Sequence, residues 1–412
     1  MNIVKKNTYM HGYRLRLYPT EEQKKLIDRY LELYRAVYNW GVEMQEARYE
    51  EKKMGKVRRG TYTAYDLGVL FTKYRNTPGN EWIKELPKET CKAALRDVYH
   101  AYDSFFKHAT NYPKFKAKKN SYQTFKTRYD RFYIDGDRVR FEGLKRDGVG
   151  RKSIVDTVRI GFDTGFSRKD GTKYCQPSIS KDYFDNYWVS FSIEEPKIEL
   201  DIPQSEPIGI DVGIRQTMVL STGEVFIRPN DRIKKYDKKL RKAHDHMMRD
   251  IQTRKRKSER TRIKYEDIPV SKRAQKRVDR VRKLYRKISN IKNDFYHKTI
   301  KEIVTRNPQA VVIETLKTRH MQAQAKKASK EYRSALHRAD FFTMHKLIEE
   351  KCNRYGIMVI KADENYPSSQ ICSNCGHIHK IYGKHIYICP NCGMRLDRDI
   401  NAALNLRNLY IQ

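Results

Sequence analysis

Apolar residues near the N-terminus follow first a strand period and then a helix period. Residues 12–18 alternate apolar and polar side chains, as expected for a strand that is buried on one face. Between residues 21 and 45 the apolar positions recur at helical spacing, and a second helical run spans about 89–108. Thr20 stands directly before the first run and is a favoured N-cap residue. The pattern predicts a strand and two helices, with a basic, glycine-containing connection between the helices.

Alternating strand signals continue to about residue 200, and 187–193 is the clearest of them. Before them, residues 111–128 interleave lysines with aromatic residues in an extended pattern. We interpret 1–18 and 121–205 as one β-rich module that carries 19–120 as a helical insertion.

Pro203 and Pro207 mark a boundary, beyond which the pattern changes. Three short apolar runs within 208–227 predict a meander of antiparallel strands. Further on, a buried-strand run at 310–316, an amphipathic helix at 339–354 and a strand at 357–360 predict a parallel pair of strands in an α/β layer. The predicted fold class is therefore multidomain α+β, with a β-rich module and its helical insertion followed by an α/β domain.

The net charge of the chain indicates which class of partner it binds. The 412 residues include 86 Lys or Arg against 50 Asp or Glu, a formal net charge of +36. Such an excess costs self-repulsion unless a polyanion offsets it, and nucleic acid is the obvious polyanion. Residues 231–290 are especially basic, and Pro269 divides them into a helical hairpin. One face of this hairpin could contact phosphates, or both helices could be solvated and laced with ion pairs.

The four cysteines closest to the C-terminus form two Cys-x-x-Cys pairs, Cys372 with Cys375 and Cys389 with Cys392. Two such turns suit a tetrahedral Zn²⁺ site, and Gly376 and Gly393 after them let the chain turn back. Disulfides or free thiols are the alternative, and a nearby imidazole could replace one thiolate, from His377, His379 or His385. The remaining cysteines show no pairing logic and no apolar stretch resembles a signal peptide or membrane span, so a reducing interior is expected.

Three carboxylates are candidates for metal chemistry. Asp211 and Glu314 interrupt runs that otherwise read as central strands, and a buried carboxylate needs a cation or hydrogen-bond donors. Asp399 opens the last predicted helix, where it could equally be an N-cap, and Asp397 competes for either role. Three oxygen ligands from separate elements suit Mg²⁺, and two ions could catalyse phosphodiester hydrolysis in a ribonuclease H type of site.

Other catalytic patterns are weaker. Asp363 and Glu364 offer another carboxylate pair after the strand at 357–360. The chain contains no Gly-x-x-x-x-Gly-Lys-Ser/Thr phosphate loop, and its histidines and serines suggest no nucleophilic triad.

Taken together, the motifs resemble those of TnpB, the transposon-encoded RNA-guided nuclease family related to type V CRISPR effectors. The resemblance spans essentially the whole chain. It includes the opening segment 13–23, the basic segment 112–116, Gly-Ile-Asp211-Val-Gly, Val-Ile-Glu314-Thr-Leu, the two cysteine pairs and Asp397-Arg-Asp399-Ile-Asn-Ala-Ala. Each motif is weak alone, but all of them together in the family order are specific.

The resemblance implies a domain plan for the chain. It assigns a wedge β-barrel-like module to 1–18 and 121–205, a helical recognition insertion to 19–120, an RNase H-like (RuvC) nuclease domain to 206–370 and 394–412 with the basic hairpin 231–290 inserted, and a zinc ribbon that binds target nucleic acid to 371–393.

The resemblance also implies the chemistry. Asp211, Glu314 and Asp399 would hold two Mg²⁺ ions, with Asp399 favoured over Asp397, and one structural Zn²⁺ would be held by Cys372, Cys375, Cys389 and Cys392. The partners would be a guide RNA, with one protein copy per guide, and a double-stranded target DNA flanked by a short motif. A prokaryotic cytoplasm or nucleoid is the expected location, with no membrane partner.

The basic segment would lie near the RNA scaffold and the flanking DNA, through Lys114, Lys116, Lys118, Lys119, Gln123 and Thr124. Three alternatives stay open: a miniature type V CRISPR effector, an RNA-guided repressor that has lost cleavage, and a zinc-ribbon transposase that needs no RNA.

Overall fold

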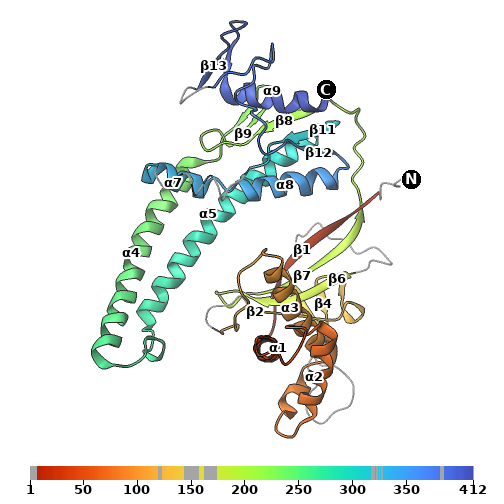
Figure 1. Ribbon diagram of the computed structural model, residues 1–412, viewed down its shortest axis with the longest axis vertical. Coiled ribbons are helices and arrows are strands. Elements are labelled where there is room, and N and C mark those ends of the chain that lie inside the picture. The colour runs from red at the N-terminus through yellow and green to blue at the C-terminus, as the bar shows by residue number, and fades with distance from the viewer. Residues whose placement is uncertain are drawn as a thin grey trace. The chain divides into compact units, whose positions relative to one another are not determined.

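The computed structural model describes residues 7–118, 123–142, 157–161, 174–316, 321, 323, 325, 328–380 and 385–411. The chain divides into two compact units (Figure 1). The N-terminal unit is 10–195, and the C-terminal unit is 196–412 together with 1–9. No helix among the described residues is long and apolar enough to cross a membrane.

The N-terminal unit joins a helical group to a seven-stranded sheet of order β2-β6-β7-β1-β5-β4-β3. Its elements are β1 (Thr8–Tyr18), α1 (Glu21–Lys53), α2 (Ala64–Asn76), η1 (Glu81–Glu85), α3 (Lys88–Phe106), β2 (Gln123–Lys126), η2 (Tyr129–Arg131), β3 (Tyr133–Asp135), β4 (Arg138–Arg140), β5 (Val158–Ile160), β6 (Tyr174–Lys181) and β7 (Tyr187–Pro196). The strand predicted at 12–18 and the two predicted helices are confirmed as β1, α1 and α3.

The start of α1 follows from its sequence. The Thr20 side chain accepts a hydrogen bond from the Gln23 backbone N–H, and the Gln23 side chain accepts one from the Thr20 N–H. This capping box satisfies donors that the first helical turn would otherwise leave unpaired. Thr20 is therefore confirmed as the N-cap.

The connection predicted between the two helices was wrong in part, because it contains a further helix, α2. Thr63 and Asp66 form a second capping box at its start, and only Leu67 and Phe71 bury their side chains. A helix with so thin an apolar stripe shows little periodicity, so its start signal was the stronger clue.

The C-terminal unit is built on a five-stranded sheet of order β10-β9-β8-β11-β12. Its elements are β8 (Ile208–Asp211), β9 (Met218–Leu220), β10 (Val225–Phe226), α4 (Asn230–Thr261), η3 (Tyr265–Asp267), α5 (Lys272–Val304), β11 (Ala310–Ile313), α7 (Lys330–Arg338), α8 (Phe341–Arg354), β12 (Met358–Lys361), β13 (Ile386–Ile388), β14 (Arg395–Asp397) and α9 (Arg398–Ile411). The predicted meander is confirmed because β8, β9 and β10 pair antiparallel. The predicted parallel pair is confirmed as β11 and β12.

Helices cover both faces of this sheet. Buried residues of α5 and α8, such as Ile300 and Met344, share one hydrophobic cluster with Ile210 and Ile313 of the strands. On the other face, Leu406 of α9 packs with Val312 of β11. The alternation of side chains along β11 thus places the sheet between two layers of helix.

Helices α4 and α5 form the hairpin predicted for 231–290, although α5 continues to Val304 (Figure 1). Their contact is a thin apolar seam that buries Leu240, Ala243 and Val281. Because this seam buries little apolar area, the hairpin depends for its stability on the C-terminal part of α5, which packs against the sheet.

Candidate metal centres

Asp211 and Glu314 lie side by side at one edge of the C-terminal sheet. Strands β8 and β11 are parallel neighbours, with Ile210 paired to Ile313, so the next residue of each strand is one of the two carboxylates. Both side chains are partly accessible to solvent. The two strands therefore present two carboxylates to the same space.

Helix α9 brings the third carboxylate, and Gly209 lets it approach. A Cβ atom built on Gly209 would lie 2.0 Å from the Ala403 carbonyl oxygen and 2.6 Å from the Arg407 nitrogen. Both distances are much shorter than van der Waals contact, so only glycine at this position lets α9 pack directly on β8. This close packing holds the first turn of α9, with Asp399, beside the strand ends.

The structure separates the roles of the two competing aspartates. Asp397 Oδ1 accepts hydrogen bonds from the backbone N–H groups of Asp399 and Ile400, at 2.8 and 3.4 Å. Asp397 thus caps α9, and the Asp399 carboxylate is left for other interactions. Its Oδ1 accepts two hydrogen bonds from the Arg398 guanidinium, at 3.0 and 3.2 Å.

Burial and neighbouring carboxylates disfavour the charged forms of Asp211 and Glu314. Burial raises the pKa of Asp211 well above its usual range, and the charges of Glu314 and Asp399 raise it further, while Arg398 opposes them. Burial also raises the pKa of Glu314 to about 7, with a smaller contribution from Asp399 and against a hydrogen bond from the Val212 N–H. Either protonation or a bound cation would lower the electrostatic repulsion within such a cluster.

The residues present fit a hard divalent cation. Carboxylate oxygens are the ligands that Mg²⁺ prefers, and here they come from three separate elements. Among the described residues, the four cysteines form a group of three or more possible ligands whose atoms converge, and the three carboxylates do not. The fit to Mg²⁺ therefore rests on the kind of ligand that the carboxylates offer and on their three separate elements.

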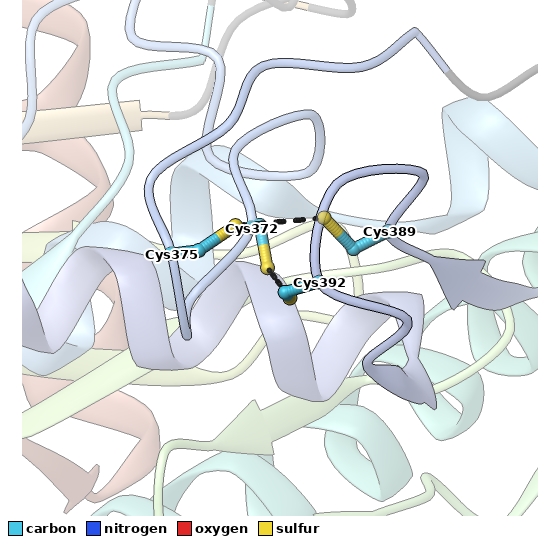
Figure 2. A group of neighbouring side chains, drawn as sticks. All are labelled: Cys372, Cys375, Cys389 and Cys392. Carbon is cyan, nitrogen blue, oxygen red and sulfur yellow. Dashed lines mark hydrogen bonds between the residues drawn. The ribbon is translucent and has the colours of Figure 1, made fainter.

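The four predicted cysteine ligands converge (Figure 2). All four Sγ atoms lie within 4.8 Å of one another, with Cys372 and Cys392 at 3.6 Å and Cys375 and Cys389 at 3.6 Å. Each of the seven cysteines is free, so the disulfide alternative is not supported. The three nearby histidines are exposed and do not join the cluster. Four converging thiols fit a tetrahedral Zn²⁺.

Each cysteine turn donates a hydrogen bond to a sulfur atom of the other turn. The side-chain amide of Asn374 donates to Cys392 Sγ at 3.6 Å, and that of Asn391 donates to Cys375 Sγ at 3.6 Å. The Asn374 amide is the main reason that the pKa of Cys392 falls to about 6. Gly376 and Gly393 have φ of 72° and 74°, which confirms the turns predicted at these glycines. Donors of this kind stabilise thiolates and hence a bound metal.

Two asparagines connect the cysteine cluster to α9. The Asn401 amide donates to the Ile371 carbonyl at 2.7 Å, and its oxygen accepts from the Ser373 N–H at 3.0 Å. One turn later, Asn405 donates to the carbonyls of Ser368 and Ile371 at 2.7 Å. Both side chains are buried. Sequence reasoning missed these residues, although their four-residue spacing within Asn-Ala-Ala-Leu-Asn places them on one helix face.

The alternative carboxylates, Asp363 and Glu364, are exposed. Asp363 Oδ1 accepts a hydrogen bond from the Asn365 N–H at 2.8 Å, which is an ordinary turn contact. Neither residue contributes to the pKa shifts of the strand-end carboxylates.

The six residues predicted to contact nucleic acid have different surroundings in the N-terminal unit. Lys114 is exposed, Lys116 is half-buried over the Tyr38 ring, and Lys118 pairs with Glu32. Thr124 donates to the Ile179 carbonyl at 3.1 Å, Gln123 donates to the Lys118 carbonyl at 3.1 Å, and Lys119 lies outside the described residues. Their contact with nucleic acid stays a prediction.

The α4–α5 hairpin carries a basic groove of about 400 Å³. Lys239, Lys242 and His246 line it from α4, and Arg273, Arg277 and Arg280 line it from α5, around Ala243. The groove lining contains no acidic residue, although Asp250 pairs with Arg277 at 2.6 Å from outside it. Such a surface suits phosphate groups.

Family models match three segments of the chain. The Helix-turn-helix domain of the OrfB_IS605 group matches residues 10–54, the OrfB_IS605 model described as a probable transposase matches 190–325, and the Cas12f1-like TNB domain matches 341–406. These segments include Asp211, Glu314, Asp399 and all four clustered cysteines.

Two curated relatives align along nearly the whole chain. A Streptomyces pristinaespiralis protein with the provisional name RNA-guided DNA endonuclease is 27% identical, over 96% of this chain and 88% of its own length. TnpB-like protein L770 of Acanthamoeba polyphaga mimivirus is 23% identical, over 97% of this chain and 73% of its own length.

Among solved structures, the Cas12f1 chain in a cryo-EM complex with sgRNA and target DNA superposes with a TM-score of 0.56. The sequences are 14% identical, and the match covers 98% of this chain and 99% of that one. The likeness shows a shared fold.

Proposed function

Because the chain belongs to the TnpB family, we propose that it is an RNA-guided endonuclease that cuts double-stranded DNA. The DNA would be complementary to a guide RNA and flanked by a short motif read by the protein. The observation that carries the proposal is the placement of Asp211 and Glu314 side by side at one sheet edge, with Asp399 near enough that its charge raises the pKa of both.

The topology of the C-terminal unit supports an RNase H-like nuclease domain. Three antiparallel strands are followed by two parallel ones, with helices on both faces of the sheet. In this fold the carboxylates belong on the first strand, at the end of the fourth and on the last helix, as they do here.

Asp211, Glu314 and Asp399 would hold two Mg²⁺ ions. Bound there, the ions would activate water and stabilise the leaving oxygen of an in-line phosphodiester displacement. The chain's own part is to position the three carboxylates: β8 and β11 fix two of them, and α9 presents the third while Asp397 occupies the cap. Arg398, which pairs with Asp399 at 3.0 Å, offers a positive charge to a phosphate oxygen near the centre.

The cysteine cluster would hold one structural Zn²⁺. Its four thiols are already converged, and the asparagine bonds join the first cysteine turn to α9. The zinc would therefore help to hold Asp399 in place as well as ordering the ribbon around β13 and β14.

The net charge of +36 supports nucleic acid partners. We propose that each protein copy binds one guide RNA. Base pairing to the guide would select the target, while the protein reads backbone shape and a few flanking bases. The exposed Lys114 and the groove on α4–α5 are the surfaces we assign to phosphate contacts. Affinity for guide RNA should therefore fall steeply as salt is raised.

The test is a cleavage assay with the purified protein, its guide RNA, Mg²⁺ and matching DNA. Wild-type protein should cut only matching DNA, and ribonuclease treatment before target addition should abolish cutting. Glu364→Ala, which removes an exposed carboxylate outside the centre, should cut normally. Cutting that never requires RNA would refute the guided mechanism in favour of a transposase.

A miniature type V CRISPR effector is the second candidate, since residues 341–406 match the Cas12f1-like TNB model. Sequencing the RNA that co-purifies separates the two. RNA from the end of a mobile element supports the transposon origin, and repeat-spacer RNA supports the CRISPR origin.

A further inference from the structure

Beside Glu314 lies a cleft of about 430 Å³ that the proposed catalysis does not use. Its floor is formed by the ends of β11 and β12. Ile313 pairs with Lys361, the Ala362 N–H donates to the Ile313 carbonyl at 2.8 Å, and Thr315 Oγ1 donates to the Ala362 carbonyl at 2.7 Å. The floor is therefore fixed to the same strand that carries Glu314.

One face of α8 forms the wall of the cleft. Phe342, His345, Lys346 and Glu349 follow each other at helical spacing and all line it. Phe342 is 75% exposed, whereas the preceding Phe341 is 5% exposed and belongs to the core. An exposed phenyl ring in the wall of a cleft that opens at a catalytic carboxylate offers a stacking surface.

The cleft lining includes two lysines, Lys346 and Lys361, beside two carboxylates, Glu314 and Glu349. Lys361 pairs with Glu349 at 2.8 Å and Lys346 with Glu350 at 3.5 Å, and all four side chains are at least 40% exposed. Exposed pairs of this kind contribute little to stability, so either lysine can exchange its partner for a phosphate at small cost. His345 also lines the cleft, and burial lowers its pKa, so its imidazole is neutral and adds no charge there.

We propose that this cleft is a nucleotide subsite for the DNA strand being cut, an inference that rests on the proposed function. The base next to the scissile phosphate stacks on Phe342, and its own phosphate lies against Lys346 and Lys361. The adjacent, scissile phosphate then lies at Glu314.

The subsite requires a single-stranded segment. The faces of a base inside a duplex are covered by its neighbours, so a ring can stack only on a base that has left the helix. The strand must therefore be separated from its complement before it reaches the carboxylates.

A series at Phe342 tests the stacking. In single-turnover assays with guide RNA and saturating target, Phe342→Ala should cut about 10- to 100-fold more slowly, the range expected for loss of one stacked base. Phe342→Leu keeps an apolar side chain without a ring and should be as slow as Phe342→Ala, whereas Phe342→Trp should cut at least as fast as wild type. Guide and target affinities should not change.

The controls separate this inference from the proposed function. Wild-type protein that never cuts refutes the proposed function itself. Wild-type protein that cuts, together with Phe342→Ala at the same rate, refutes the subsite alone. A normal rate for Phe342→Leu beside a slow Phe342→Ala also refutes it, because it indicates packing and not stacking.

A crosslinking experiment tests the contact directly. Non-cutting Asp211→Asn protein with guide RNA is bound to target DNA that carries 5-iodouracil beside the scissile phosphate, and the complex is irradiated. The crosslinked peptide should contain Phe342, and Phe342→Ala should lose that crosslink. A peptide from another part of the chain, with none from α8, would overturn the assignment.

Discussion

The two candidate metal centres of the C-terminal unit lie on neighbouring segments of one chain but differ in how their side chains are held. The cysteine cluster is organised by neutral donors, because side-chain amides from Asn374 and Asn391 each reach a sulfur of the other turn. The carboxylate centre has few such donors, and its charges oppose one another. An ion bound by the cysteines would become part of the fold, whereas an ion bound by the carboxylates would offset charges that the fold alone disfavours.

The largest effect is expected from removing a carboxylate ligand. Asp211→Ala should slow DNA cutting at least about 1,000-fold, since a metal ligand contributes several kcal/mol to the transition state. Guide and target binding should be retained, as measured by gel shift at the same salt. Cutting at the wild-type rate would refute the assignment of the centre.

A stability measurement tests whether burial, with a smaller contribution from Asp399, raises the pKa of Glu314 in the folded protein. The folded pKa of Glu314, about 7, is above the unfolded value, so the folded protein binds more protons between pH 4.5 and 7. Its free energy of unfolding therefore falls as the pH rises through this window. The Gln side chain in Glu314→Gln does not ionise, so the variant does not lose stability in this window. Without metal, it should be more stable than wild type at pH 8 by about 3 kcal/mol.

Denaturant unfolding in chelator at pH 4 and pH 8 measures that difference. It should be small at pH 4, and adding Mg²⁺ at pH 8 should stabilise only the wild-type protein. A metal-free Glu314→Gln protein that is less stable than wild type at pH 8 would show that folding does not raise the pKa of Glu314.

A substitution in the cysteine cluster should destabilise the protein, in contrast to Glu314→Gln. Cys392→Ser should release zinc, destabilise the protein at every pH near neutrality and slow cutting about 10- to 100-fold, because loss of one ligand weakens both the metal and the turn that joins α9. Zinc content is measured by elemental analysis beside the cleavage rate. Full cutting by zinc-free protein would show that the carboxylate centre does not depend on the cysteine cluster.

The smallest effect is expected at the link between them. Asn401→Ala leaves the Ser373 N–H without its partner and removes one of the two donors to the Ile371 carbonyl, which keeps its bond from Asn405. It should slow cutting about 10-fold, the cost of about one buried hydrogen bond. It should also raise the Mg²⁺ concentration needed for half-maximal rate, with zinc content unchanged. Combining it with Cys392→Ser should add little, because both changes act through the position of α9.

Sequence patterns predicted most of this architecture wherever an element carries a strong period or a strong cap. Thr20 and the strands that hold Asp211 and Glu314 are examples, since alternation and apolar runs report burial directly. The α2 helix was missed because it buries only Leu67 and Phe71. The choice between Asp397 and Asp399 depended on the family resemblance, because capping is decided by backbone geometry that composition does not reveal.

Other features could not be predicted because they arise only when distant segments meet. The pairing of Asn401 with Ser373 and Ile371 depends on how α9 crosses the first cysteine turn. The cleft beside Glu314 depends on which face α8 turns toward β12. Assignment of the three carboxylates as metal ligands stays a prediction for the variants above to decide.

Gly209 carries no functional group, yet it faces the backbone of α9 at a distance that leaves no room for a methyl group. In a library containing every substitution at every position, selection for DNA cutting should leave glycine alone at 209. A genetic screen would therefore rank this residue with the metal ligands, even though it donates nothing to an ion or a phosphate. Intolerance to substitution here would report how closely two backbones pass.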